Sequence, residues 1–226
     1  MHFPADPDHV QQLLPSELTV ETFPDEYGQP KAWIGLVTFS MKQIRPPGFP
    51  AVPWLSAFLE TNVRTYVRHN GHMPGVWFFS LDAERLLACV YAREVFGLNY
   101  LHSVMRSWAI ENEYHYSVRR LDEPQAELAL SYETFKAENR IANGKFAQPR
   151  TFEFWLCERY LLYSKRGSEL LTGRVWHRPY SLWPATVNQL EQTLITSQGL
   201  RTGELAHVVY SPGIDVEVFS PIREIY

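Results

Sequence analysis

The sequence predicts an α+β protein, built on a large curved antiparallel β-sheet or incomplete barrel with two or three helices. Two observations support this fold class. Segments rich in β-forming residues recur along the chain, separated by turn-forming residues, whereas few segments have helical patterning. The 226 residues are 45% hydrophobic and 14% aromatic, which is enough to fill a substantial core. No linker marks a boundary, so residues 1–226 are expected to form a single domain.

The first part of the chain is predicted to contain one short helix and three strands. The helix covers residues 7–14, because Asp6 or Asp8 lies near its start and Pro15 ends it. Residues 58–67 fit a helix or a strand, but their alternating pattern favours a strand with one polar face. The predicted strands here cover residues 32–39, 58–67 and 76–81.

Two longer helices are predicted further along the chain. Asp82 is a suitable N-cap, residues 83–88 have high helix propensity, and the helix should end at Gly97. Residues 92–100 would then finish this helix and begin a strand. The second helix should start at Pro184 and end at Gly199, with leucines four positions apart. The other predicted strands cover residues 114–120, 126–132, 151–164, 169–176, 205–210 and 216–219.

Composition argues against several classes of protein. The net charge is -4 and no basic tract occurs, so the electrostatic signature of a nucleic-acid-binding protein is absent. No apolar run approaches the roughly 20 residues that cross a bilayer. Met1 leads directly to acidic and proline residues, which does not fit a signal peptide. Cys89 and Cys157 are expected to be reduced and buried, so we expect a cytoplasmic protein.

Four segments carry a resemblance to a known family. They are residues 60–67, 75–83, 154–160 and 207–213. Together they resemble the YqjF-like family of uncharacterised bacterial proteins, domain of unknown function 2071, over nearly the whole chain. The resemblance implies a fold and a pocket but no reaction. Relatives usually carry one more segment ahead of Phe3, and its loss here would expose an edge strand.

A second, more distant resemblance lies in residues 92–100, Ala-Arg-Glu-Val-Phe-Gly-Leu-Asn-Tyr. This segment is similar to the Gly-Arg-Glu-x-x-Gly-x-Pro-Lys-Lys signature of acetoacetate decarboxylases, whose first lysine forms a Schiff base. The two lysine positions are Tyr100 and Leu101 here. The scaffold is therefore expected to persist without imine chemistry. The remaining lysines lie near predicted turns or strand ends: Lys31, Lys42, Lys136, Lys145 and Lys165. They lack the burial or cationic neighbours that a Schiff-base lysine needs, except that Lys165 precedes Arg166 at an apparent hairpin tip.

The main candidate site follows the predicted strand over residues 58–67. Glu60, Asn62, Arg64 and Tyr66 share one face of it, because side chains repeat every two residues in a strand. Such a face either lines a cavity or faces water, and the pattern leaves both open. The resemblance favours the cavity, with Glu60 as the counterpart of a pocket glutamate in acetoacetate decarboxylases.

The segment around Gly97 supplies two more candidates. Arg93 can hold a substrate carboxylate with its bidentate fork, and Tyr100 can donate a hydrogen bond or act as a weak acid. The alternative is that Arg93 and Glu94 form surface ion pairs and that Tyr100 belongs to the core.

The remaining candidates have strong structural alternatives. Arg159 and Tyr160 are candidate ligand-binding residues, although an ion pair from Arg159 to Glu60 or Asp82 fits as well. His177 is either a pocket acid/base or a buried, hydrogen-bonded histidine, and the second reading is favoured.

Three functions remain open at this level. The first is an enzyme acting on a small carboxylate or carbonyl compound without a Schiff base, with Glu60, Arg93, Tyr100 and His177 as catalytic residues. The second is a non-catalytic protein that binds a small molecule. The third is a structural or interaction protein, and a homo-oligomer is compatible with all three. No cofactor is expected and no metal site, because His69 and His72 lack a third ligand at suitable spacing.

Overall fold

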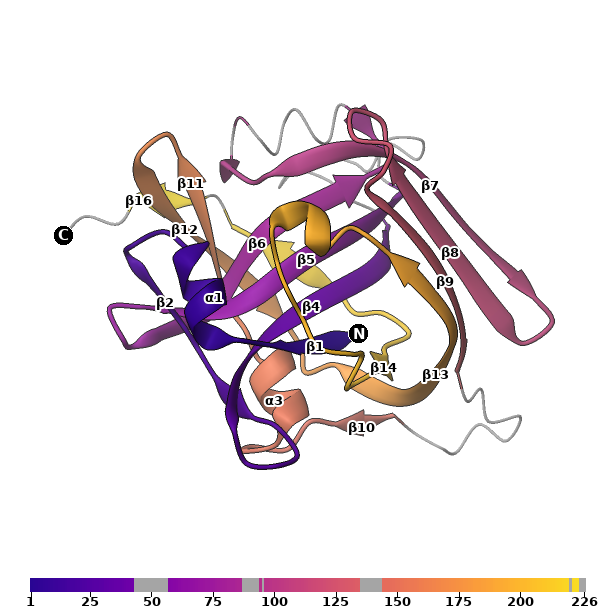
Figure 1. Cartoon of the computed structure of the whole chain (residues 1–226), viewed down its shortest axis with the longest axis horizontal. Coiled ribbons are helices and arrows are strands. Elements are labelled where there is room, and N and C mark those ends of the chain that lie inside the picture. The colour runs from indigo at the N-terminus through magenta and orange to yellow at the C-terminus, as the bar shows by residue number, and fades with distance from the viewer. Residues whose placement is uncertain (43–56, 87–93, 95, 135–143, 220, 224–226) are drawn as a thin grey trace.

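The computed structural model describes residues 1–42, 57–86, 94, 96–134, 144–219 and 221–223. Most of the chain lies in strands, which curl into a half-barrel sheet with short helices against it (Figure 1). The helices are α1 (Pro7–Gln12), α3 (Phe152–Cys157) and the 3₁₀ turn η1 (Thr196–Gln198). The strands are β1 (His2–Ala5), β2 (Leu18–Val20), β3 (Phe23–Pro24), β4 (Pro30–Met41), β5 (Phe58–His69), β6 (Met73–Ala83), β7 (Tyr100–Ile110), β8 (Glu113–Arg120), β9 (Glu127–Thr134), β10 (Lys145–Phe146), β11 (Leu161–Arg166), β12 (Glu169–His177), β13 (Ser181–Gln192), β14 (Val209–Tyr210), β15 (Val216–Val218) and β16 (Ile222–Arg223). The predicted α+β class and curved sheet are confirmed.

The main path of the sheet runs β1-β4-β5-β6-β7-β8-β9-β13-β10. Its pairs are antiparallel except β6 with β7, and β11 also adds to β6 in parallel. The register of β5 and β6 shifts between Val63 and Arg64, which marks a bulge at the centre of the sheet. The outer edge of β1 is not open as expected, because His2 and Ala5 form bridges to His207 and Thr202.

The central strands β5 and β6 are covered on both faces, which explains why so few of their residues are exposed. One face joins the large apolar cluster that β7, β8, β9 and the segment after β13 complete. Its buried members include Val63, Met105, Tyr116, Leu128 and Leu194. The other face packs against α3 and β11 through a smaller cluster. Its buried members include Trp33, Tyr66, Leu156 and Leu162.

The local patterns identify several elements correctly. The predicted helix over residues 7–14 is α1, and the Asp6 carboxylate accepts a hydrogen bond from the Asp8 backbone N–H at 3.2 Å, as an N-cap does. Residues 58–67 form the strand β5, as the alternation favoured. No helix of the described residues is long and apolar enough to cross a membrane.

The predicted strand over residues 151–164 is wrong in its first half. Thr151 caps a short helix there, since its hydroxyl accepts a hydrogen bond from the Phe154 backbone N–H at 3.2 Å. The aromatic residues that suggested a strand pack onto β4 and β5 from this helix, α3. The strand β11 begins only at Leu161.

The helix predicted from Pro184 to Gly199 is also wrong. Residues 181–192 form the strand β13, which pairs with β9 over residues 185–192. Two leucines at four-residue spacing are a weak helical signal, and the long-range pairing with β9 overrides it. Gly199 ends only the short 3₁₀ turn η1.

The predicted helix N-cap at Asp82 is a third correction. The strand β6 runs through Asp82 to Ala83, and the Asp82 carboxylate forms an ion pair with Arg120 instead. Leu86, Glu94 and Phe96, which fall within the predicted helix, are helical. Residues 87–93, with the candidate Arg93, lie outside the described part of the chain.

Candidate ligand-binding site

Four polar or amphipathic side chains on β5 form a buried row, which we call the polar row: Glu60, Asn62, Arg64 and Tyr66. Glu60, Asn62 and Tyr66 are buried, and Arg64 is partly buried. The row therefore faces the interior, so the water-facing alternative is wrong. It lies on the side of the sheet that α3 covers, since Tyr66 packs in the same cluster as Leu156.

At one end of the polar row, the Tyr100 hydroxyl donates a hydrogen bond to Glu60 Oε2 at 3.0 Å. Tyr100 starts β7, and its partner in the parallel pairing with β6 is Leu81, which in turn lies opposite Asn62 on β5. The sheet register therefore brings Tyr100 to the face of the polar row. The contact between Glu60 and Tyr100, which were separate candidates in the sequence, rests on this register.

Burial makes Glu60 an unusually weak acid. Desolvation raises the pKa of its carboxyl group to about 7, with a further rise from the nearby Asp82 charge and a partial offset from the Tyr100 hydrogen bond. At neutral pH the group therefore populates both protonation states. A carboxyl group tuned in this way can take up or release a proton in a reaction.

The other end of the polar row is organised by Gly35 on β4, which lies opposite Arg64. A Cβ atom at Gly35 would lie 3.2 Å from Arg64 Cγ, 3.4 Å from Arg64 Nε and 3.5 Å from the Tyr66 hydroxyl oxygen. The missing side chain thus lets Arg64 and Tyr66 lean over the β4 backbone. The pattern of the sequence did not identify Gly35 as part of the site.

Within the described part of the chain, three buried polar atoms of the row have no hydrogen-bond partner at ordinary geometry: Asn62 Oδ1, Arg64 Nε and Tyr66 Oη. The Tyr66 hydroxyl and the Arg64 guanidinium still interact, electrostatically and through a looser hydrogen-bonding contact outside that geometry. Burial disfavours the charge on Arg64, whereas Tyr66, Tyr180 and Cys157 favour it more strongly, so the pKa of Arg64 is raised. Burial raises the pKa of the Cys157 thiol to about 11, which makes it a poor nucleophile.

Next to this end of the row lie two histidines that the sequence analysis did not link. Nδ1 of His2 lies 3.1 Å from Nδ1 of His207, and Nε2 of His207 lies 3.3 Å from a carboxylate oxygen of Glu153. Nε2 of His2 is buried and has no hydrogen-bond partner among the residues that the structure describes. His2 pairs with Gly35 across β1 and β4, so it lies beside Arg64 and Tyr66.

Arg159 has a structural environment that the sequence did not predict. Its Nη1 forms an ion pair with Glu21 at 2.6 Å, and the guanidinium lies over the rings of Tyr66 and Trp155. Arg68 pairs with the same carboxylate at 2.8 Å. The suggested partners of Arg159, Glu60 and Asp82, are therefore wrong.

The predicted site residues Tyr160 and His177 contact each other rather than Glu60. Their rings stack at 4.7 Å between centroids, and the Tyr160 hydroxyl donates to the Glu158 carboxylate. Nδ1 of His177 lies 2.8 Å from the Arg178 carbonyl oxygen. This is the buried, hydrogen-bonded histidine that the sequence analysis favoured.

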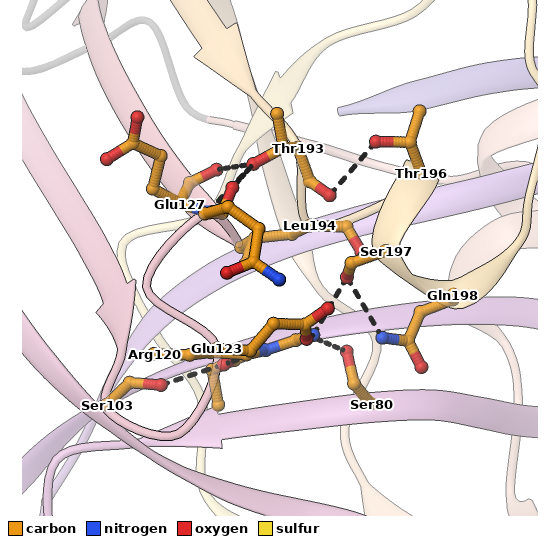
Figure 2. A network of polar contacts seen from close by, with 12 residues as sticks. Ser80, Ser103, Arg120, Glu123, Glu127, Thr193, Leu194, Thr196, Ser197 and Gln198 are labelled. Carbon is orange, nitrogen blue, oxygen red and sulfur yellow. Dashed lines mark hydrogen bonds and ion pairs between the residues drawn. The ribbon is translucent and has the colours of Figure 1, made fainter.

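The opposite face of β5 and β6 carries a second buried polar cluster, centred on Arg120 (Figure 2). Arg120 donates to both carboxylate oxygens of Asp82, at 2.8 and 3.0 Å. The same guanidinium donates to Ser80, Glu123 and Ser197, and Ser103 donates to Asp82. We call these residues the arginine network.

A surface depression of about 820 Å³ also lies away from the polar row, between β7, β8 and the ends of β4 and β5. Its lining includes Ser40, Arg106, Trp108 and Ser117, none of them a predicted site residue. Among the residues that the structure describes, no group of three His, Cys, Asp or Glu side chains could hold a metal ion.

Several proteins resemble this chain. The model of the DUF2071 family, described as an uncharacterized conserved protein, matches residues 1–215. The uncharacterized protein YqjF of Bacillus subtilis is 31% identical over 224 residues, which cover 99% of this chain and 87% of YqjF.

Solved structures share the fold at low sequence identity. An acetoacetate decarboxylase-like enzyme from Sphingomonas wittichii has a TM-score of 0.58 at 15% identity, with 99% of this chain and 88% of that chain covered. Acetoacetate decarboxylase from Legionella pneumophila has a TM-score of 0.56 at 13% identity, with 100% and 82% covered. The enduracididine biosynthesis enzyme MppR, complexed with pyruvate, has a TM-score of 0.53 at 12% identity, with 97% and 82% covered. The chain therefore belongs to the DUF2071 family of uncharacterized conserved proteins and has an acetoacetate decarboxylase-like fold.

Proposed function

We propose that this protein binds a small carboxylate or carbonyl compound at the polar row and transfers a proton there without a Schiff base. The observation that carries the proposal is the set of unpartnered buried atoms on Asn62, Arg64 and Tyr66. A buried polar atom without a hydrogen bond costs about 1–3 kcal/mol, so native proteins rarely leave several together. A polar ligand would supply the missing partners.

Arg64 is the natural carboxylate-binding group of the row. Its guanidinium presents several donors in a planar fork that matches a carboxylate. No carboxylate of the described residues forms an ion pair with it, whereas Arg120 and Arg159 are both paired. This role was assigned to Arg93 from the sequence, and Arg64 now takes it in the proposal.

Glu60 and Tyr100 supply the proton chemistry. A carboxyl group with a pKa of about 7 can remove a proton from the carbon next to a carbonyl group and later return it. Tyr100, at 3.0 Å from Glu60, orients that carboxyl group.

The described lysines support a mechanism without an imine. None of them is among the buried residues, and Lys165 lies 3.7 Å from the Glu17 carboxylate in a partly exposed ion pair. A Schiff-base lysine needs burial or cationic neighbours, and Lys165, although it precedes Arg166, is not buried and has an acidic partner.

Non-catalytic binding is the second candidate. Arg159 and His177 are held in an ion pair and a backbone hydrogen bond, respectively. Few titratable groups besides Glu60 therefore remain for catalysis, which favours binding without turnover.

Calorimetric titration with pyruvate tests binding, since MppR binds this compound on the same fold. We expect Arg64→Met to weaken binding at least tenfold, because one charge-assisted hydrogen bond contributes about 1.5–3 kcal/mol. Arg119→Met is the matched control, since Arg119 is an exposed arginine on β8. Equal effects of the two variants would refute the carboxylate site, and so would the absence of binding by pyruvate and by the related small acids lactate and propionate.

Proton transfer is tested separately by the exchange of the pyruvate methyl protons in D₂O, followed by ¹H NMR. Glu60 would take a methyl proton to form the enolate and return a deuteron. We expect exchange with the wild type and a large loss with Glu60→Gln. Binding without exchange would establish the non-catalytic alternative.

A further inference from the structure

The histidine pair beside the polar row has a defined hydrogen-bond direction. Glu153 presents only acceptor atoms when ionised, so the nitrogen facing it, Nε2 of His207, must carry the proton. A neutral His207 then has a bare Nδ1, which accepts a hydrogen bond from Nδ1–H of His2. His2 is therefore left with a bare Nε2, which can only accept a hydrogen bond.

Both histidines are suited to the neutral state that this direction requires. Burial holds the pKa of His2 well below its ordinary value, and positive charge at the N-terminal amino group, on a protonated His207 and on Arg64 acts in the same direction. Burial also lowers the pKa of His207, although Glu153 acts in the opposite direction. The half-exposed Glu153 thus fixes the tautomer of the buried His2 ring through His207, which lies between them.

The side chain of His2 lies on the same face of the sheet as the unpartnered atoms of the row. His2 and Arg64 are the two neighbours of Gly35 across the sheet, and the Arg64 side chain leans over Gly35. The His2 and Tyr66 rings lie 6.4 Å apart. The two nitrogens of an imidazole diverge, so Nε2 of His2 points away from His207, and it has no partner there.

The unmet atoms of this corner are of both kinds. Arg64 Nε needs an acceptor, His2 Nε2 and Asn62 Oδ1 need donors, and Tyr66 Oη can donate or accept. A carboxylate offers only acceptors, and a ketone adds one more acceptor. A hydroxyl group next to the carboxylate adds a donor and keeps an acceptor for Tyr66.

We propose that the ligand of the polar row is a hydroxy acid, whose carboxylate binds Arg64 and whose hydroxyl donates a hydrogen bond to Nε2 of His2. This inference rests on the proposed carboxylate site and narrows its ligand class. Glu153 and His207 are positioning residues, which act by holding the accepting tautomer of His2.

The test compares three acids that share a carboxylate and a three-carbon chain: lactate in both enantiomers, pyruvate and propionate. Calorimetric titration of the wild type should show one lactate enantiomer binding at least tenfold more tightly than pyruvate and propionate. His2→Phe keeps a ring but removes the acceptor, so it should abolish this preference while leaving propionate affinity within about twofold. His72→Phe is the control, because His72 is exposed in the turn between β5 and β6.

The tautomer gives a second readout that needs no ligand. Long-range ¹H–¹⁵N NMR spectra of histidine-labelled protein should show His2 protonated at Nδ1 and His207 protonated at Nε2. A His2 ring protonated at Nε2 would overturn the inference.

The two proposals fail in different ways. If all three acids bind through Arg64 with equal affinity, the hydroxy-acid inference is overturned and the carboxylate site stands. If no acid binds, both are overturned. An unchanged lactate preference in His2→Phe would also reject the role of His2.

Discussion

The two faces of the β5–β6 hairpin bury polar groups in opposite ways. On one face, the arginine network joins Arg120 and Asp82 through two hydrogen bonds, and serine side chains take up further positions. On the other face, the polar row leaves buried atoms of Asn62, Arg64 and Tyr66 unpartnered. The same two strands carry both sets, so burial alone does not distinguish them. The pairing of the buried atoms does, and it is the basis of the proposed ligand site, because a closed network has no free hydrogen-bonding atoms for a ligand.

The largest expected change in the free energy of unfolding comes from removing Arg120, the centre of the arginine network. Arg120→Met removes the partner of Asp82, which has 0% exposure, and so leaves a buried charge unpaired. We expect a loss of about 3–5 kcal/mol in the free energy of unfolding, measured by urea denaturation. Arg119→Met, one residue earlier and exposed, should stay within about 0.5 kcal/mol of the wild type.

The same substitution on the polar row should behave differently. Arg64→Met removes a guanidinium that has no carboxylate partner among the described residues and that carries an unpartnered Nε. Its replacement by an apolar side chain of similar length should therefore change the free energy of unfolding by less than about 1 kcal/mol, or raise it. Equal losses in Arg64→Met and Arg120→Met would contradict the distinction between the two faces.

Glu60 makes the polar row sensitive to pH in a defined direction. Its folded pKa of about 7 exceeds the ordinary value of 4.5, so the folded state holds the proton more tightly than the unfolded state. Unfolding therefore releases a proton between these pKa values, and stability falls as the pH rises from about 4.5 to about 7. The total fall should be of the order of 3 kcal/mol.

Urea denaturation at several pH values measures this slope. Glu60→Gln cannot ionise and can still accept the Tyr100 hydrogen bond, so the contribution of Glu60 to the slope should vanish in this variant. A slope that persists unchanged in Glu60→Gln would assign the pH dependence to other groups.

The smallest effect should come from Tyr100→Phe. The variant deletes the hydrogen bond that favours the ionised form of Glu60, so the pKa of Glu60 should rise further. A carboxyl ¹³C NMR titration of wild type and variant measures the change. A lower pKa in Tyr100→Phe would mean that the hydroxyl stabilises the protonated carboxyl group instead.

Local sequence patterns predicted the central strand and its polar face, because a two-residue period needs no knowledge of distant partners. They failed at residues 151–164 and 181–192, where the cap at Thr151 and the pairing with β9 decide the structure. Resemblance placed Tyr100 among the candidates, but its contact with Glu60 depends on the parallel register of β6 and β7.

No local sequence pattern could predict the contact between the two histidines beside the polar row. His2 and His207 are 205 positions apart, and they meet only when the sheet closes. The role of Gly35 likewise depends on residues distant in the sequence, because it is Arg64 and Tyr66 that occupy the space beside it.

The parallel addition of β11 to β6 bears on how the chain reaches this structure. Val76 on β6 pairs with Leu162 on β11, so this part of the β6 edge cannot be paired until β11 has been synthesised. Contacts of such long sequence separation require large loops to close before any contact compensates for the lost entropy, which slows folding. Until β11 arrives, the edge of β6 presents open backbone groups that can pair with other chains. Slow folding and early exposure of this edge are thus built into the strand order.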